Sequence, residues 1–427
     1  MPGNSARKED IMERSYESAA ALVARAAGPL ADHLGPFVAS LIDQQYAASV
    51  VHVKARHALA FDRWLAKRRV AAADLGEVHI EQYQRRSRHR HRSIRAETRC
   101  RERLEVSKVL QFLRARGVCR SADVGSMPAD VFVVGFKQHL QQHQGLAAAT
   151  IGTYSRFAFQ FLHQRFGTGE VDLRALRPID PVEFVQRQAK RMHPPALQCV
   201  VNAMRSLLRY AQYRGEVAPE LVAAVPAVAT WTTTPQLPRA ISPEHAQRAI
   251  DSCDLRTSLG LRDRAVLLLL ARLGLRAHEI IALQLEDCDW DAGCLRVRGK
   301  GGRECLLPMP ADVGEAIAAY LERGRPASAD RHLFLRSMAP IRGFVPGSYA
   351  IGSIVRYALR RAKVNAPHTG SHQFRHALAV RMLERGASFT EIGEVLRHRS
   401  PQTTSIYARV DISALRSLAP AWPGGAR

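Results

Sequence analysis

Apolar residues three and four positions apart recur through most of residues 36–220, in runs of about 10 to 15 residues that Pro and Gly interrupt. This spacing places the apolar side chains on one face of a helix. Strand signals are few in this part of the chain. The pattern therefore predicts that the first half of the protein is a series of amphipathic helices.

Part of this helical pattern repeats at an offset of 98 residues, the separation between Phe61 and Phe159. At the same offset, the segment "VLQFLRARG" that ends at Gly117 matches "LLRYAQYRG", which ends at Gly215, and an Asp-Leu pair also recurs. Two related helical modules would produce this repetition. A chance likeness between amphipathic helices is the alternative, and both interpretations stay open here.

A Pro- and Thr-rich stretch over residues 225–244 indicates a linker. Beyond it, Ser242 is a candidate N-cap, and the apolar segment "DRAVLLLLARLG" predicts a core helix that Gly274 ends. The segment "CLRVRGKGGRECLLP" predicts a β-hairpin, because Leu295 and Val297 alternate with arginines and "GKGG" supplies turn residues. We therefore expect a mainly α fold with a small β-hairpin or sheet, divided into a helical module (1–120), a second helical domain (121–224), a linker (225–241) and an α+β domain (242–427).

The excess of basic over acidic residues indicates which class of partner the protein binds. Lys and Arg outnumber Asp and Glu by 62 to 39, which gives a formal net charge of +23 and favours a polyanion. A membrane partner is disfavoured, because no uncharged apolar run approaches the roughly 18 to 20 residues of a membrane helix. Charges interrupt the first thirty residues where a signal peptide needs an apolar segment, so we expect a cytoplasmic protein. Its seven scattered cysteines contain no C-x-x-C pair and are expected to be reduced.

Several residues in the second half have the chemistry needed to act on a phosphodiester. Guanidinium groups bind two phosphate oxygens at once, a tyrosine hydroxyl can attack phosphorus, and His or Lys can move the protons. The candidates, in chain order, are Arg276 with Glu279 one turn later, Lys300 at the hairpin tip, His372 and Arg375 in "HQFRH", His398, and Tyr407 in "TTSIYARV".

Each candidate taken alone has an ordinary structural interpretation. The His-x-x-Arg pattern also occurs at 89–92 and 245–248. Lys300 alone would be a solvated turn lysine, Tyr407 a half-buried packing residue, and Arg276 with Glu279 a surface ion pair. The order and spacing of the whole set are what favour a catalytic site.

That set of motifs resembles the tyrosine recombinases, also called phage integrases, over residues from about Leu237 to Leu418. The helical region from about Asp130 to Val217 is similar to the core-binding domain that precedes the catalytic domain in this family. The resemblance implies a helical core-binding domain followed by an α+β catalytic domain. One difference is that Arg397 precedes His398, where the family commonly has glycine.

The resemblance also implies a role for each residue. Arg276 and Arg375 would hold the scissile phosphate, His372 and His398 would bind it and assist proton transfer, and Glu279 would position its neighbours. Lys300 would protonate the leaving 5′ oxygen while Tyr407 forms a 3′-phosphotyrosine. The implied reaction needs no metal ion, ATP or other cofactor. The implied partner is double-stranded DNA with paired recombination sites, on which protomers associate as a tetrameric synapse.

The stretch "QRRSRHRHRSIR" over residues 84–95 contains no acidic residue. It is interpreted as a strip that follows DNA phosphates, with a solvated loop as the alternative. The candidate DNA contacts are Arg85, Arg86, Arg88, Arg90, Arg92, Arg95 and, near the catalytic set, Arg397.

The predicted function is site-specific DNA recombination for integration, excision or transposition of a mobile element. A DNA-relaxing topoisomerase would form the same covalent bond, but it would not produce recombinant joints. A catalytically inert DNA-binding regulator would not need the whole catalytic set. An RNA-binding helical protein would be expected to carry the aromatic signatures of RNA modules, which are missing from this sequence.

Overall fold

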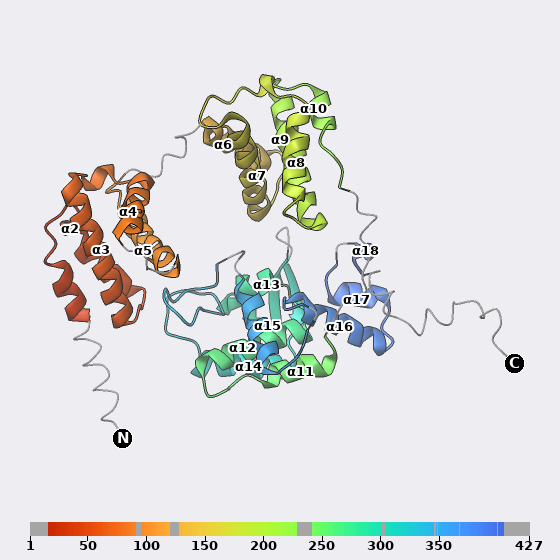
Figure 1. Ribbon diagram of the computed structural model, residues 1–427. Coiled ribbons are helices and arrows are strands. Elements are labelled where there is room, and N and C mark those ends of the chain that lie inside the picture. Colours follow the sequence, from red (N-terminus) through yellow and green to blue (C-terminus); the bar gives the residue numbers. More distant parts are fainter. Residues whose placement is uncertain are drawn as a thin grey trace. The chain divides into compact units, whose positions relative to one another are not determined.

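The computed structural model describes residues 16–90, 96–119, 128–228, 241–299, 304–345, 347, 349–366, 368–398 and 400–404. The chain divides into two compact units, Met1–Thr232 and Thr233–Arg427. The described residues of the first unit form helices and no strand, and the second unit combines helices with a three-stranded sheet (Figure 1). The predicted fold class is confirmed. The finer division at residues 120, 224 and 241 stays a prediction.

The N-terminal bundle, residues 16–119, is built around α3, which packs against α2 and α5. Its core contains an aromatic cluster in which the Phe61 ring lies 5.9 Å from the Trp64 ring and 5.0 Å from the Tyr83 ring. Buried aromatic pairs at such distances stabilise a core beyond their burial alone. The elements of this bundle are α2 (Ala31–Asp43), α3 (Ala48–Arg68), the 3-10 helix η1 (Ala72–Asp74), α4 (Glu77–Arg90) and α5 (Ala96–Ala115).

The central bundle, residues 128–228, buries a separate apolar core between α6, α7, α8 and α9. Phe136, Phe161 and Phe184 are its largest fully buried side chains. The elements are α6 (Pro128–Gln142), α7 (Ala148–Phe166), the 3-10 helix η2 (Leu173–Ala175), α8 (Ile179–Ala189), α9 (Pro194–Tyr213) and α10 (Pro219–Ala223).

From α2 to α5 and from α6 to α9, the two bundles have the same order of elements: two helices, a 3-10 helix and two further helices. The last helices also agree in register, since Gly117 and Gly215 both follow them with positive φ, 68° and 73°. The register does not extend to α3 and α7, because Phe61 is fully buried while Phe159 is only half-buried. Duplication therefore stays a prediction. At the predicted offset, the buried residues Val106, Val109, Leu110 and Leu113 of α5 correspond to the buried residues Met204, Leu207, Leu208 and Ala211 of α9.

The second unit contains the predicted hairpin as part of an antiparallel sheet in the order β1-β2-β3. Leu295 pairs with Leu307 and Val297 with Cys305, so the alternation read from the sequence gives the observed register. Leu295 and Val297 are buried and Arg296 between them is exposed, as a half-buried strand requires. The strands are β1 (Cys288–Asp289), β2 (Cys294–Arg298) and β3 (Glu304–Pro308).

The core of this unit is formed around α12, whose residues 265–271 are all buried. Arg272 ends this apolar run and pairs with Asp312 at 2.8 Å, so the segment is a core helix as predicted. The Ser242 hydroxyl accepts a hydrogen bond from the His245 amide, which confirms the predicted N-cap. The remaining elements are α11 (Pro243–Asp251), α12 (Ser258–Arg272), α13 (Ala277–Ala282), the 3-10 helix η3 (Leu285–Asp287), α14 (Ala311–Arg323), α15 (Ala350–Arg361), α16 (His372–Glu384), α17 (Phe389–Val395) and α18 (Pro401–Thr404).

Within the described residues, no helix is both long and apolar enough to cross a bilayer. Those cysteines whose side chains are described, Cys119, Cys199, Cys253, Cys288, Cys294 and Cys305, are free thiols.

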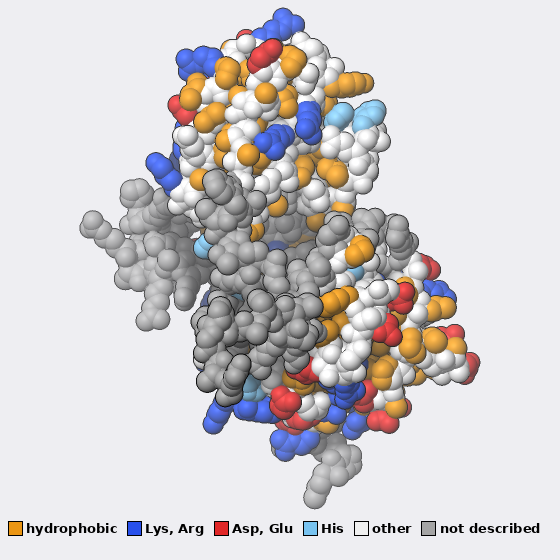
Figure 2. All heavy atoms as spheres, turned by 90° about the vertical axis from the view of Figure 1, so that its right-hand side faces the viewer, with side chains coloured by type: hydrophobic (Ala, Val, Ile, Leu, Met, Phe, Trp, Pro, Cys, Tyr) orange, Lys and Arg blue, Asp and Glu red, His pale blue; other side chains and the backbone are white. Residues whose placement is uncertain are grey.

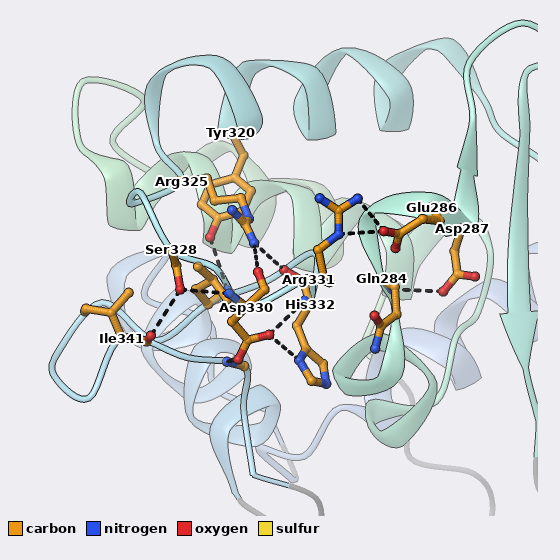
Figure 3. Close-up of polar contacts among 12 residues, drawn as sticks. Gln284, Glu286, Asp287, Tyr320, Arg325, Ser328, Asp330, Arg331, His332 and Ile341 are labelled. Carbon is orange, nitrogen blue, oxygen red and sulfur yellow. Dashed lines mark hydrogen bonds and ion pairs between the residues drawn. The ribbon is translucent and has the colours of Figure 1, made fainter. Parts of the chain in front are cut away.

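The loop between α14 and α15 is held by the carboxylate of Asp330 (Figure 3). Its oxygens accept hydrogen bonds from the His332 amide at 2.9 Å, the His332 ring at 2.6 Å and the Gly343 amide at 2.8 Å. Burial alone would raise the pKa of this carboxyl group, but the three hydrogen bonds and the His332 charge lower it to about 2. The ionised form of Asp330 therefore stabilises the loop.

Replacing this carboxylate tests its contribution. We expect Asp330→Asn to lower the free energy of unfolding by about 1 to 2 kcal/mol at pH 7, allowing for solvent screening. Because the folded pKa lies below the unfolded one, the stabilisation is present above about pH 4 and is lost as the pH falls towards 2. Urea unfolding at pH 7 and pH 3 should show the smaller difference at pH 3. Glu286→Gln, which removes an exposed ion pair with Arg331, is the control and should change stability little.

Candidate active site

Arg276 stands at the start of α13 and is fixed by Glu279 one turn later. The Glu279 carboxylate accepts hydrogen bonds from the Arg276 backbone amide at 2.9 Å and from its Nη1 at 2.8 Å. Arg276 Nη2 also donates to the Arg397 carbonyl at 3.2 Å, which joins α13 to the end of α17. The Glu279 side chain is fully buried, whereas that of Arg276 is 26% exposed. The guanidinium group is therefore held in one orientation and still reaches the surface.

Arg375 is the second predicted phosphate ligand, and it is buried on α16. Its Nη1 donates to the carbonyl of Gly274 and its Nη2 to the carbonyl of Leu396. These bonds tie α16 to the ends of α12 and α17. Gly274 is required at this point, because it has a φ of 57° and an added Cβ would lie 2.7 Å from Leu396.

His372 and His398 complete the described part of the predicted set. His372 begins α16, one turn before Arg375. His398 Nδ1 lies 2.7 Å from the Thr404 hydroxyl, which leaves Nε2 as the ring nitrogen available to a substrate. Thr404 is buried, so this contact fixes the imidazole plane.

The histidines of the site share an electrostatic environment dominated by desolvation and by the two arginines. Burial lowers the pKa of His398 to about 4, and the charges of Arg375 and Arg276 act in the same direction. Desolvation by the surrounding protein and the same two charges also lower the pKa of His372. Both imidazoles are therefore neutral near pH 7 in the protein without DNA. A neutral imidazole can accept a proton, and a bound anion would favour its protonated form.

The structure thus brings together Arg276, Glu279, His372, Arg375 and His398 from α13, α16 and the end of α17. Two predicted residues, Lys300 and Tyr407, lie outside the described residues. Sequence reasoning missed the part played by Gly274 and Thr404. Gly274 was visible only as a helix end, and Thr404 only as a neighbour of Tyr407.

Comparison with known proteins identifies this arrangement. Residues 239–413 match the model of the phage integrase family. An integrase/recombinase of Sinorhizobium fredii is 43% identical over 403 residues, which cover 94% of this chain and 96% of that protein. The chain belongs to the phage integrase family of tyrosine recombinases. Tyrosine recombinase XerD of Ralstonia nicotianae is 30% identical over 66% of this recombinase and 91% of its own length.

Among solved structures, the XerH site-specific recombinase in a post-cleavage complex has the same fold, with a TM-score of 0.53 and 18% identity over 68% of this recombinase and 84% of that chain. The predicted family is therefore confirmed. As a member of it, this recombinase breaks and rejoins DNA strands. The roles of the individual residues stay predictions.

Arg397 occupies the position where glycine is common in this family. It has a φ of 53°, in the left-handed region that favours glycine, so the turn keeps its shape at the expense of some backbone strain. Its Nη2 donates to Glu279 at 2.9 Å, and its side chain is only 15% exposed. The buried Glu279 carboxylate therefore lies between two guanidinium groups. Burial alone would raise its pKa, but the Arg276 amide and the charges of Arg397 and Arg276 lower it.

The predicted DNA contacts at the N-terminal strip are only partly described. Arg85 is exposed on α4, and the helix continues to Arg90. The side chains of Arg86, Arg88 and Arg90, and the whole of Arg92 and Arg95, lie outside the described residues. A DNA contact by Arg397 also stays a prediction, because its described contacts are all within the recombinase.

The Arg397–Glu279 pair can be tested against a matched position. Arg397→Gly removes the ion pair, which costs about 3 kcal/mol, but relieves roughly 1 kcal/mol of backbone strain, so we expect a net loss of about 1 to 2 kcal/mol. Lys363→Gly is the control, since Lys363 has a φ of 52° and makes no ion pair with another described residue. It should keep or slightly raise stability. Equal changes in urea unfolding of the two variants would show that the Glu279 pair contributes nothing.

The low pKa of His398 predicts that DNA binding depends on pH. A bound phosphate raises that pKa, so the complex takes up a proton and affinity should increase as the pH falls from 7.5 to 5.5, by up to about tenfold per pH unit for one full proton. Fluorescence anisotropy with a labelled duplex measures this slope. His398→Gln should flatten it. A slope that is the same in both proteins would mean that His398 does not sense the phosphate.

Proposed function

We propose that this recombinase cuts and rejoins duplex DNA at paired recombination sites through a covalent bond between Tyr407 and a 3′ phosphate. The observation that carries the proposal is the convergence of Arg276, Arg375, His372 and His398 on one surface, with Glu279 fixing Arg276. In the attack, the Tyr407 hydroxyl gives its proton to a neutral imidazole of the site and its oxygen bonds to phosphorus. The bond to the 5′ oxygen breaks, and Lys300 supplies the proton that this oxygen takes up.

The two arginines have the charge that this reaction requires. Negative charge builds on the non-bridging phosphate oxygens in the transition state, and preorganised cations stabilise it without reorganising. Arg375 is fixed by two backbone carbonyls and Arg276 by Glu279, so both are oriented before DNA binds. The phosphotyrosine keeps the energy of the broken phosphodiester. A 5′ hydroxyl of the partner strand can therefore attack it and reseal the DNA without a nucleotide cofactor.

The positive net charge of the protein supports a DNA partner. The net charge is +23. On the face drawn in Figure 2, Lys and Arg side chains are scattered over the central bundle α6–α10, among apolar side chains and with few acidic ones. We infer that this bundle contacts DNA phosphates, since such contacts set position and affinity.

The XerH recombinase of similar fold was solved on a palindromic DNA substrate. We infer from this and from the name of the Sinorhizobium relative that the present enzyme also acts on paired, inverted half-sites. Its assembly is a tetrameric synapse, its location is the cytoplasm on nucleoid DNA, and its role is integration, excision or transposition of a mobile element.

Removing the nucleophilic hydroxyl tests the proposal. Tyr407→Phe should keep DNA affinity but form no covalent adduct, because only the attacking oxygen is lost. The measurement is a denaturing gel with a nicked suicide duplex that carries the half-sites flanking the gene. Arg375→Lys is a second variant and should cleave about 100- to 1,000-fold more slowly, since an ammonium group lacks the bidentate fork. An adduct that persists in Tyr407→Phe would place the nucleophile elsewhere.

A further inference from the structure

A basic pocket lies on the N-terminal bundle, far in sequence from residues 239–413 that match the family model. It has a volume of about 480 Å³. Three cationic side chains line it, Arg25 from the loop before α2 and Arg63 and Lys67 from α3, and among the described residues no acidic side chain does so. Trp64, which is almost fully buried, also contributes to its wall.

The pocket is a built feature of the fold. The carboxylate of Asp62 is completely buried and accepts hydrogen bonds from the Gly28 amide at 3.0 Å and the Leu30 amide at 2.7 Å. These bonds hold the loop that carries Arg25 against α3. A Cβ at Gly28 would lie 2.4 Å from Asp62, so the close approach requires glycine. The Asp62 carboxylate thus binds backbone amides and forms no ion pair with the lining cations.

The three cations are open to an external anion. Arg25, Arg63 and Lys67 are exposed, and none forms an ion pair or hydrogen bond with another described residue. Arg63 and Lys67 are one turn apart on α3, an arrangement of like charges that disfavours the helix unless an anion lies between them.

Some other cations of the same bundle form ion pairs. Lys54 pairs with Glu105, and Arg114 pairs with Glu77 through two hydrogen bonds. The three cations of the pocket have no such acidic partner among the described residues and lie together in one concave site.

The basic surface continues beyond the pocket along α3. Arg56 is exposed two turns before Arg63, on the same side of the helix, about 10 Å further along the axis. A single small anion would occupy the pocket alone. A polymer of phosphates can contact the pocket and Arg56 together, which favours nucleic acid over free phosphate.

We propose that this pocket binds a backbone phosphate of duplex DNA, so that the N-terminal bundle is an additional DNA-binding module of the recombinase. The proposal rests on the proposed function, which supplies the DNA. The N-terminal bundle has the same element order as the central bundle, for which a DNA contact is also proposed. Under this proposal, both bundles contact the duplex. The contact adds affinity and little sequence preference, because phosphates carry no base identity.

The test compares two double variants of the full-length protein. Arg63→Ala with Lys67→Ala removes two of the three pocket cations. Arg68→Ala with Arg116→Ala removes the same net charge from the same bundle, at exposed arginines that stack on Trp64 and Phe112 and do not line the pocket. Affinity for a labelled duplex is measured by anisotropy at several salt concentrations.

We expect the pocket variant to lower the slope of log K against log salt by about 0.9 for each phosphate that the protein no longer neutralises, and the control to leave the slope unchanged. Equal slopes in the two variants would overturn the proposal. So would binding of inorganic phosphate to the wild type, detected by calorimetry and abolished in the pocket variant, with no change of the duplex slope.

The covalent adduct on suicide DNA separates this proposal from the proposed function. Because the pocket residues are remote in sequence from the catalytic set, the pocket variant should form the adduct to the wild-type extent when DNA is saturating. Adduct formation with an unchanged salt slope would remove the pocket proposal and keep the catalytic one. Absence of any adduct with the wild-type protein would instead reject the proposed function.

Discussion

The candidate active site depends on the hydrogen bonds that the buried carboxylate of Glu279 accepts. A fully buried ionised carboxyl group is unfavourable unless charged and hydrogen-bonded partners surround it. Here it accepts from the Arg276 amide, the Arg276 guanidinium and the Arg397 guanidinium. The partners come from the start of α13 and the end of α17, which are more than a hundred residues apart in the chain. The same group therefore joins two distant segments and orients Arg276, the proposed phosphate ligand.

Arg375 also joins distant segments and belongs to the proposed site, but here the buried group is a cation that donates hydrogen bonds. A buried guanidinium group needs acceptors, and the carbonyls of Gly274 and Leu396 provide them at the ends of two helices. Those carbonyls would otherwise lack intrahelical donors. The same two hydrogen bonds thus satisfy two helix ends and place the proposed phosphate-binding cation. A substitution of Gly274 or Arg375 would disturb both.

Local patterns were sufficient to predict much of the fold and the site. The alternation around Leu295 and Val297 predicted the strand and its register, Ser242 predicted a helix start, and the apolar run before Arg272 predicted a core helix. These features depend on neighbours in sequence. Arg276 and His372 were found because their residue types match a specific chemistry at a recognisable spacing.

What the sequence did not reveal depends on contacts between distant segments. Arg397 was interpreted as a candidate DNA contact, and nothing local indicates that its side chain turns towards Glu279. The basic pocket on α3 was missed because Arg25 is brought to Arg63 only by the tie between Asp62 and the loop at Gly28. Phe61 and Phe159 match in type but not in burial, since burial is decided by the helices packed around them.

The hydrogen bond between His398 and Thr404 has a consequence for how the imidazole is held in place. Thr404, whose hydroxyl lies against the His398 ring, is buried and precedes the proposed nucleophile by three residues. Displacement of Thr404 would release the orientation of the imidazole, so the geometry of His398 depends on a residue that follows it in the chain.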